Sequence, residues 1–157
     1  MRKSQITRIP QNAPFRDQTW MNVDRTASVE VTSEEHDHPI ESALLLEGHG
    51  GWRASNPGVQ TIRLIFDEPQ KLRRILLVFE DSENSRTQEF VLRWSPDIQY
   101  SSREIVRQQW NFSPPDSVRE TEDYAVELSD VRVLELVIVP EKSGGEVHAS
   151  LVSLRLA

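Results

Sequence analysis

Apolar and polar residues alternate along most of this chain, which is the pattern of half-buried β-strands. In residues 27–33, for example, Val29 and Val31 are separated by polar residues, so that one face is apolar. Strands of this kind, or strands that are apolar on both faces, are expected over residues 61–66, 72–80, 87–95, 103–112, 123–128, 132–139 and 147–156. No window of about 11 or more residues favours the helical period of 3.6. The pattern therefore predicts an all-β protein.

Short turn sequences separate these strands. Asp67-Glu68-Pro69, Ser95-Pro96-Asp97 and Ser129-Asp130 contain the Pro, Asp and Ser residues that favour turns. About eight strands at such regular spacing indicate an antiparallel β-sandwich or barrel. Residues 34–58 form the longest stretch without clear periodicity. A stretch of this length in a compact domain is expected to be functional or to carry small elements of its own.

The length of 157 residues fits one domain. The chain has no cysteine, which excludes disulfides, thiolate metal sites and thiol nucleophiles. The mean hydropathy is −0.52, and no apolar run approaches the ~20 residues of a membrane span. No apolar segment follows the charged start as it would in a signal peptide. We therefore expect a cytoplasmic protein without a membrane partner.

Charge is unevenly distributed along the chain. Residues 1–26 hold five Lys or Arg and two acidic residues, whereas the remainder holds 13 basic and 23 acidic residues. An acidic body argues against a nucleic-acid partner, because nonspecific binding requires a basic patch. We expect residues 1–26 to form a partly ordered N-terminal arm ahead of a domain over 27–157. Phe15 and Trp20 in this arm indicate that part of it packs.

The order of several short motifs resembles that of a known superfamily. Residues 45–55 (LLEGHGGWRAS) resemble the discoidin-type loop L-x-D-G-…-T-x-W-x-A/S, and extended apolar strands follow it. Residues 86–97 resemble the segment R…f-x-v-x-x-S-x-D-G, and residues 133–140 and 149–156 resemble the closing strands. Over residues 27–157 the chain thus resembles the galactose-binding-like β-sandwich superfamily, which includes coagulation-factor type C (discoidin) domains and many carbohydrate-binding modules. This resemblance implies an antiparallel jelly-roll β-sandwich of about eight strands.

The chain departs from this family at the positions that usually hold a structural calcium ion. Glu47 stands where the loop Asp is expected, and Ser153 stands where the last strand usually has a Glu. Calcium requires six to eight oxygen ligands, and too few candidates remain. We therefore expect no calcium site and no other cofactor. Ile98 also replaces the Gly that usually follows the Asp of the S-x-D-G turn.

In this superfamily the ligand usually lies on loops at one end of the sandwich. The resemblance therefore suggests His49, Arg53 and Arg86 as ligand-binding residues, joined by Trp110 or Tyr100 according to the loop geometry. Arginine and histidine would bond sugar hydroxyls, and the aromatic rings would stack on the apolar face of a sugar. Trp52 and Trp94 are expected in the core, Trp94 because it shares a strand face with apolar neighbours.

Neither a metal site nor an active site is indicated. His36 and His38 would be the ligands of any metal, but solvated loop histidines are the simpler interpretation. Acidic neighbours occur at 67–68, 80–81 and 122–123, where strand alternation points adjacent side chains apart. A glycosidase requires two carboxyls about 5–9.5 Å apart across one bond. No nucleophile elbow, phosphate loop or dinucleotide motif is present, so we expect no enzyme.

Two functional hypotheses remain open. The first is a non-catalytic module that binds a carbohydrate or a similar polar ligand through loops at one end of the sandwich. The alternative is a cytoplasmic protein-interaction or structural domain that has kept the fold without sugar binding. The sequence identifies neither the ligand nor the oligomeric state.

Overall fold

The computed structural model describes residues 19–99 and 102–157, together with the backbone of residues 7–8. The prediction of an all-β protein is confirmed, with two helices of one turn each among the described residues. The elements in chain order are β1 (Thr7–Arg8), α1 (Val23–Thr26), β2 (Ala27–Val31), α2 (Glu41–Leu44), β3 (Trp52–Arg53), β4 (Gln60–Glu80), β5 (Arg86–Ser95), β6 (Arg103–Phe112), β7 (Arg119–Val139), β8 (Ser150–Leu151) and β9 (Ser153–Leu156).

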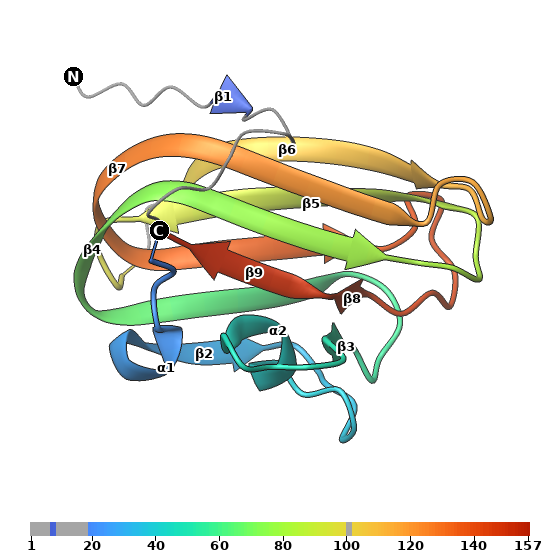
Figure 1. Ribbon diagram of the computed structural model, residues 1–157, viewed down its shortest axis with the longest axis horizontal. Coiled ribbons are helices and arrows are strands. Elements are labelled where there is room, and N and C mark those ends of the chain that lie inside the picture. Colours follow the sequence, from blue (N-terminus) through green and yellow to red (C-terminus); the bar gives the residue numbers. More distant parts are fainter. Residues whose placement is uncertain (1–6, 9–18, 100–101) are drawn as a thin grey trace.

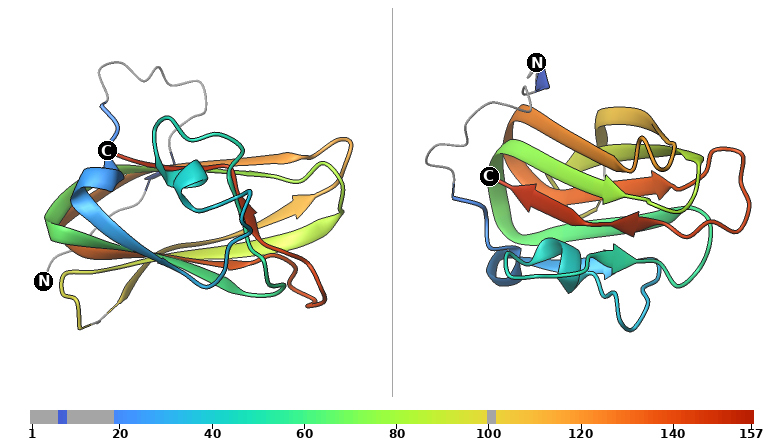
Figure 2. Two further views of the ribbon diagram at one scale, coloured as in Figure 1. Left: turned by 90° about the horizontal axis from the view of Figure 1, so that it is seen from below. Right: turned by 45° about the vertical axis from the view of Figure 1, so that its right-hand side comes forward.

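The strands form two packed layers, and two long strands belong to both (Figure 1, Figure 2). The first layer contains β2, residues 60–66 of β4, residues 131–139 of β7, β5 and β6. The second layer contains β9, residues 70–80 of β4, residues 119–128 of β7, and β1. All of these pairings are antiparallel. The molecule is therefore a β-sandwich, as predicted.

The turns predicted at residues 67–69 and 129–130 are wrong, because the chain continues there as strand. The strands predicted over 61–66 and 72–80 are one element, β4, and those over 123–128 and 132–139 are both part of β7. The β4–β7 register shifts between Ile65 and Gln70 and again before Arg74. Such irregularities bend a strand, and the bend carries each strand from one layer to the other. Pro69 is tolerated where the ladder is interrupted.

Residues 34–58 carry small elements of their own, as predicted. They contain α2 and β3, and β3 pairs with β8 in a separate two-stranded sheet. The strand predicted over 147–156 is shorter than expected, because only β8 and β9 are strands within it. Within the described part of the chain, no helix is long and apolar enough to cross a membrane.

The core lies between the two layers. Phe79 of the second layer stacks on Phe90 of the first, with 5.3 Å between ring centroids. Trp52 is 1% exposed, and its Nε1 donates to the Ser33 carbonyl at 3.0 Å, so its predicted core position is confirmed. Trp94 is partly buried and packs against the core. The loops that follow β3, β4, β6 and β7 gather at one end of the sandwich, on the right of Figure 1.

Candidate functional site

The structure separates the residues that were predicted to bind a ligand. Arg86 and Trp110 lie at the loop end of the first layer, where β5 and β6 pair through Arg86–Phe112 and Gln88–Trp110. His49 and Arg53 lie on the opposite flank, just before and within β3 (Figure 1, Figure 2). Tyr100 lies outside the described residues. The four described candidates therefore do not form one cluster.

Arg86 is buried and bonded to other parts of the protein. Its Nε donates to Asp81 Oδ2 at 2.6 Å, and its Nη1 donates to the Gln88 side chain and to the Pro140 carbonyl. The guanidinium also lies over the Phe112 ring, 4.6 Å from its centroid. Burial raises the pKa of Asp81, but hydrogen bonds from Arg86 and from two backbone N–H groups outweigh burial and lower it. These contacts give Arg86 a role in joining segments of the chain.

The flank around β3 is an exposed polar surface. Arg53 pairs with Glu35 at 2.9 Å, and half of the Arg53 side chain is exposed. His49 is exposed, and His38 Nδ1 lies 3.2 Å from the Gly50 carbonyl. Among the described residues, no group of three or more His, Asp or Glu side chains could hold a metal ion.

A pocket of about 360 Å³ lies along β6 and is lined by Gln109, Trp110, Asn111 and Ser117. β6 ends the strand order β2-β4-β7-β5-β6, so its outer edge is not paired within that order. The turn after β6 brings Ser117 back to the strand, where its hydroxyl donates to the Asn111 carbonyl at 3.3 Å. We refer to this site as the β6 pocket.

The β6 pocket presents both donors and acceptors. Thr87 Oγ1 donates to Asn111 Oδ1 at 2.8 Å, which leaves the Asn111 amide nitrogen for a ligand. Gln109 Nε2 donates to Glu89 at 3.4 Å, which leaves the Gln109 side-chain carbonyl. Trp110 Nε1 is buried and has no hydrogen-bond acceptor among the described protein atoms. Because this nitrogen has no accessible surface, the part of the partly buried Trp110 side chain that a ligand can touch is the ring and not the N–H.

Charges beside the β6 pocket are paired with one another. Glu89, on β5, accepts hydrogen bonds from Lys142 Nζ at 2.9 Å and from Arg107 Nη1 at 2.6 Å. These two cations lower the pKa of Glu89 to about 2. Arg107 also pairs with Glu104 at 2.9 Å. The carboxylate thus stays charged over the ordinary pH range and balances the cations.

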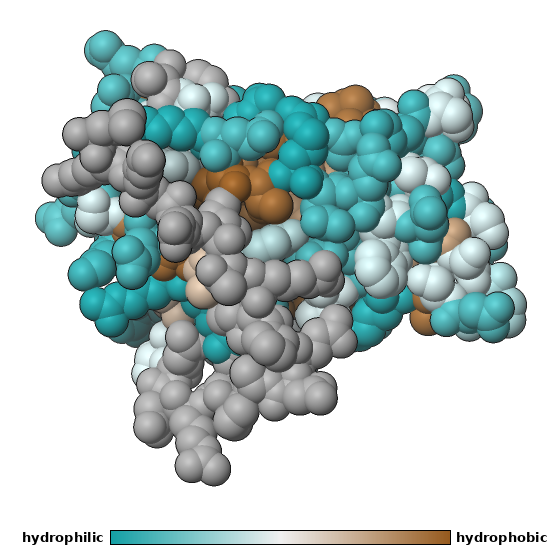
Figure 3. Space-filling model, turned by 90° about the horizontal axis from the view of Figure 1, so that it is seen from above, coloured by the Kyte–Doolittle hydropathy of each residue, from teal (hydrophilic) through white to brown (hydrophobic). Residues whose placement is uncertain are grey.

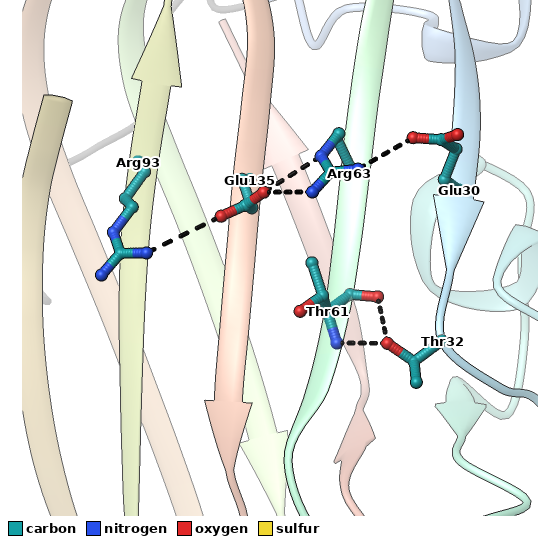
Figure 4. A network of polar contacts seen from close by, with 6 residues as sticks. All are labelled: Glu30, Thr32, Thr61, Arg63, Arg93 and Glu135. Atoms are coloured by element: carbon teal, nitrogen blue, oxygen red, sulfur yellow. Dashed lines mark hydrogen bonds and ion pairs between the residues drawn. The ribbon is translucent and has the colours of Figure 1, made fainter. Parts of the chain in front are cut away.

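A second ionic network crosses the same outer face of the first layer. Arg63 lies between two carboxylates, with Glu135 at 2.7 Å and Glu30 at 3.1 Å (Figure 4). Arg93 approaches Glu135 from the other side at 3.9 Å. These are cross-strand pairs of opposite charge, which stabilise neighbouring strands. In the view from above Figure 1, an apolar area lies beside a row of hydrophilic residues (Figure 3).

Three of the four residues that line the β6 pocket were not singled out in the sequence. Gln109 and Asn111 alternate with Trp110, so the pattern indicated only polar positions on a strand face. Ser117 lies in a turn rich in Pro and Ser, and its distance from Asn111 depends on how the chain returns to β6. The one local sequence signal for a binding site was the pair of amide residues, Gln109 and Asn111, that flank Trp110.

Comparison with solved structures shows what this fold is similar to. A family 32 carbohydrate-binding module of AlyQ, in complex with 4,5-unsaturated mannuronic acid, matches with a TM-score of 0.63 and 14% identity, over 89% of this chain and 98% of that one. The family 32 module of Clostridium perfringens NanJ, in complex with galactose, matches with a TM-score of 0.56 and 17% identity, over 83% and 97% of the two chains.

A third match is part of an enzyme. A Ruminococcus gnavus family GH29 fucosidase in complex with fucose gives a TM-score of 0.63 at 9% identity, over 87% of this chain but only 26% of that chain. No protein-family model matches the sequence, and no curated protein matches it. The likeness therefore shows the fold, which is the galactose-binding-like β-sandwich that the sequence motifs resembled.

Proposed function

We propose that this protein is a non-catalytic module that binds carbohydrate in the β6 pocket. The observation that carries this proposal is the composition of the pocket, in which an aromatic residue that is only partly buried, Trp110, lies among two amides and a hydroxyl. A sugar hydroxyl both donates and accepts hydrogen bonds, and this set of groups can meet both needs. The volume of about 360 Å³ lies within the range of small-molecule sites.

A role in binding rather than catalysis is supported by the groups at the pocket. None of its four lining residues carries a carboxylate, whereas glycoside hydrolysis needs two about 5–9.5 Å apart. The carbohydrate-binding modules with this fold support the same proposal. The fucosidase agrees with it, because this chain matches only about a quarter of that enzyme.

A glycan array probed with the full chain, with and without calcium, tests the proposal. We expect calcium-independent binding. Trp110→Ala removes the aromatic ring on which a sugar would stack, so it should weaken binding by about twofold to tenfold, the usual value of an aromatic contact. Arg53→Ala is the matched control on the β3 flank and should leave the affinity unchanged.

Two results would contradict the proposal in different ways. A blank array would remove carbohydrate as the ligand. Binding that survives Trp110→Ala but is lost in Arg53→Ala would move the site to the exposed flank around β3, where Arg53 and His49 lie.

A further inference from the structure

We propose that Glu89 makes the β6 pocket selective for neutral saccharides over anionic ones. This inference rests on the proposed function, because it concerns the charge of the ligand that the same pocket accepts. It assigns a specificity-determining role to a side chain that does not line the pocket but is bonded to Gln109, which does.

The pocket itself carries no formal charge, since it is lined by two amides, an indole and a hydroxyl. Two cations bond Glu89, however, which is itself bonded to the lining residue Gln109. Lys142 Nζ and Gln109 Nε2 both donate to the same oxygen of Glu89, at 2.9 and 3.4 Å. Arg107 lies two residues from Gln109 on the same strand face and bonds the other oxygen of Glu89. A sugar carboxylate in the pocket would therefore lie near two cations.

Glu89 neutralises these cations before any ligand arrives. The Glu89 side chain is only 10% exposed, and ion pairs fix it to Arg107 of β6 and to Lys142 in the loop after β7. Together with Glu104, it gives two carboxylates for two cations. Since the pKa of Glu89 is about 2, this balance persists at any ordinary pH. The carboxylate of a bound uronic acid would therefore find no unpaired cation in the protein. Because binding also removes water from that carboxylate, a uronic acid should bind more weakly than a neutral sugar.

Glu89→Gln tests the role of this charge, because the amide keeps the shape of the side chain. Affinities are measured by titration with three matched pairs of probes: galactose and galacturonate, glucose and glucuronate, mannose and mannuronate. The wild type should bind the neutral member of a pair more tightly. In Glu89→Gln the uronate affinity should rise about threefold to tenfold, as expected for an uncompensated cation about 6 Å away in an effective dielectric constant of about 40 to 80. The neutral sugar should bind within twofold of its wild-type affinity.

Two further variants separate the charge effect from a change in packing. Glu89→Gln combined with Lys142→Gln restores the local charge balance and should remove the gain. Glu104→Gln also removes a carboxylate from Arg107, but Glu104 does not bond Gln109, so its effect should be smaller. The gain in Glu89→Gln should shrink toward none at about 0.5 M salt, where the Debye length is only a few ångströms.

The possible failures are distinguishable. If no member of any pair binds, and the array is blank, the proposed function fails. If the wild type binds a uronate as tightly as its neutral partner, or if Glu89→Gln gives no gain, carbohydrate binding stands and the role of Glu89 is overturned. If Glu89→Gln does not fold, the wild-type preference at about 0.02 M salt decides, because an uncompensated cation would favour the uronate most strongly there.

Discussion

At the scale of single residues, Arg86 has several buried contacts to lose. Its buried guanidinium joins the loop after β4, β5 itself and the Pro140 carbonyl. We expect Arg86→Met to lower the free energy of unfolding by about 3–5 kcal/mol, because Asp81 would keep its charge without its partner. Urea denaturation measures the change. Arg119→Met is the control, since Arg119 pairs with Glu80 on the surface and should cost about 1 kcal/mol or less.

The outcome for Arg86 also bears on its predicted role in ligand binding. If Arg86→Met lowers stability as expected and the folded protein still binds glycan, Arg86 serves to hold segments of the chain together. Loss of binding at unchanged stability would favour the role predicted from the sequence, with Arg86 in contact with the ligand.

Glu89 should make stability depend on pH in a defined direction. Its pKa falls from 4.5 to about 2 on folding, mainly through Lys142 and Arg107. A lowered pKa in the folded state stabilises the protein above the unfolded value, and this contribution is lost as the pH falls through the folded value. The wild type should therefore exceed Glu89→Gln by about 1 kcal/mol above pH ~5, the upper range for partly exposed pairs.

This difference should decrease between about pH 4.5 and pH 2 and vanish below it. Urea denaturation of both proteins at a series of pH values measures it. A difference that stays constant, or grows as the pH falls, would contradict the assignment of the charge.

At the scale of elements, the pairing of β3 with β8 depends on Gly51. This residue has φ = 67°, and a Cβ atom would lie 2.6 Å from the Leu151 carbonyl oxygen. Gly50 has φ = 82°, but its nearest neighbour would lie 3.9 Å away. Gly50→Ala should cost about 1–2 kcal/mol for the left-handed conformation alone. Gly51→Ala should cost at least about 1 kcal/mol more, because the backbone of β8 must shift. If urea denaturation gave the same loss of unfolding free energy for both variants, the close approach of Gly51 to β8 would contribute nothing to stability.

The elements also show how far a sequence pattern reaches. Alternation located the strands other than the two-residue β1 and β3, because it reports which face of a strand is buried. It divided β4 and β7 wrongly at Asp67-Glu68-Pro69 and Ser129-Asp130. Residues of these types occur both in tight turns and in bends that carry a strand from one layer to the other. The choice between the two depends on whether the second half finds a partner in the other layer, which is a property of the whole fold.

The candidate site was predictable only in part, for a related reason. Trp110 was identified from its residue type and its mixed strand. Ser117 reaches Asn111 only because the turn after β6 folds back, and Glu89 meets Lys142 only because the loop after β7 returns to β5. His49 and Arg53 were grouped with Arg86 through the resemblance to a family, but β3 lies on the other flank of the sandwich.

At the scale of the whole molecule, β4 and β7 couple the two layers. Each strand has 21 residues and pairs in the first layer over one half and in the second layer over the other. Buried contacts add to this coupling, since Gln88 of the first layer donates to Glu120 of the second at 3.1 Å. If β4 and β7 unpair in one layer, the same two strands are also disturbed in the other layer. Unfolding should therefore be a single transition.

Two matched substitutions test this coupling. Val91 on β5 and Val78 on β4 are both buried but lie outside the central core cluster, in the first and the second layer respectively. Changing either to Ala removes about two methylene equivalents and should cost about 1–3 kcal/mol. Native-state hydrogen exchange is measured for the backbone amides of β5 and of β9. Each substitution should reduce the protection of the most protected amides in both strands by the same free energy, because those amides exchange through global unfolding. If Val78→Ala lowered protection in β9 alone, the layers would open separately, and the shared strands would not make the molecule one cooperative unit.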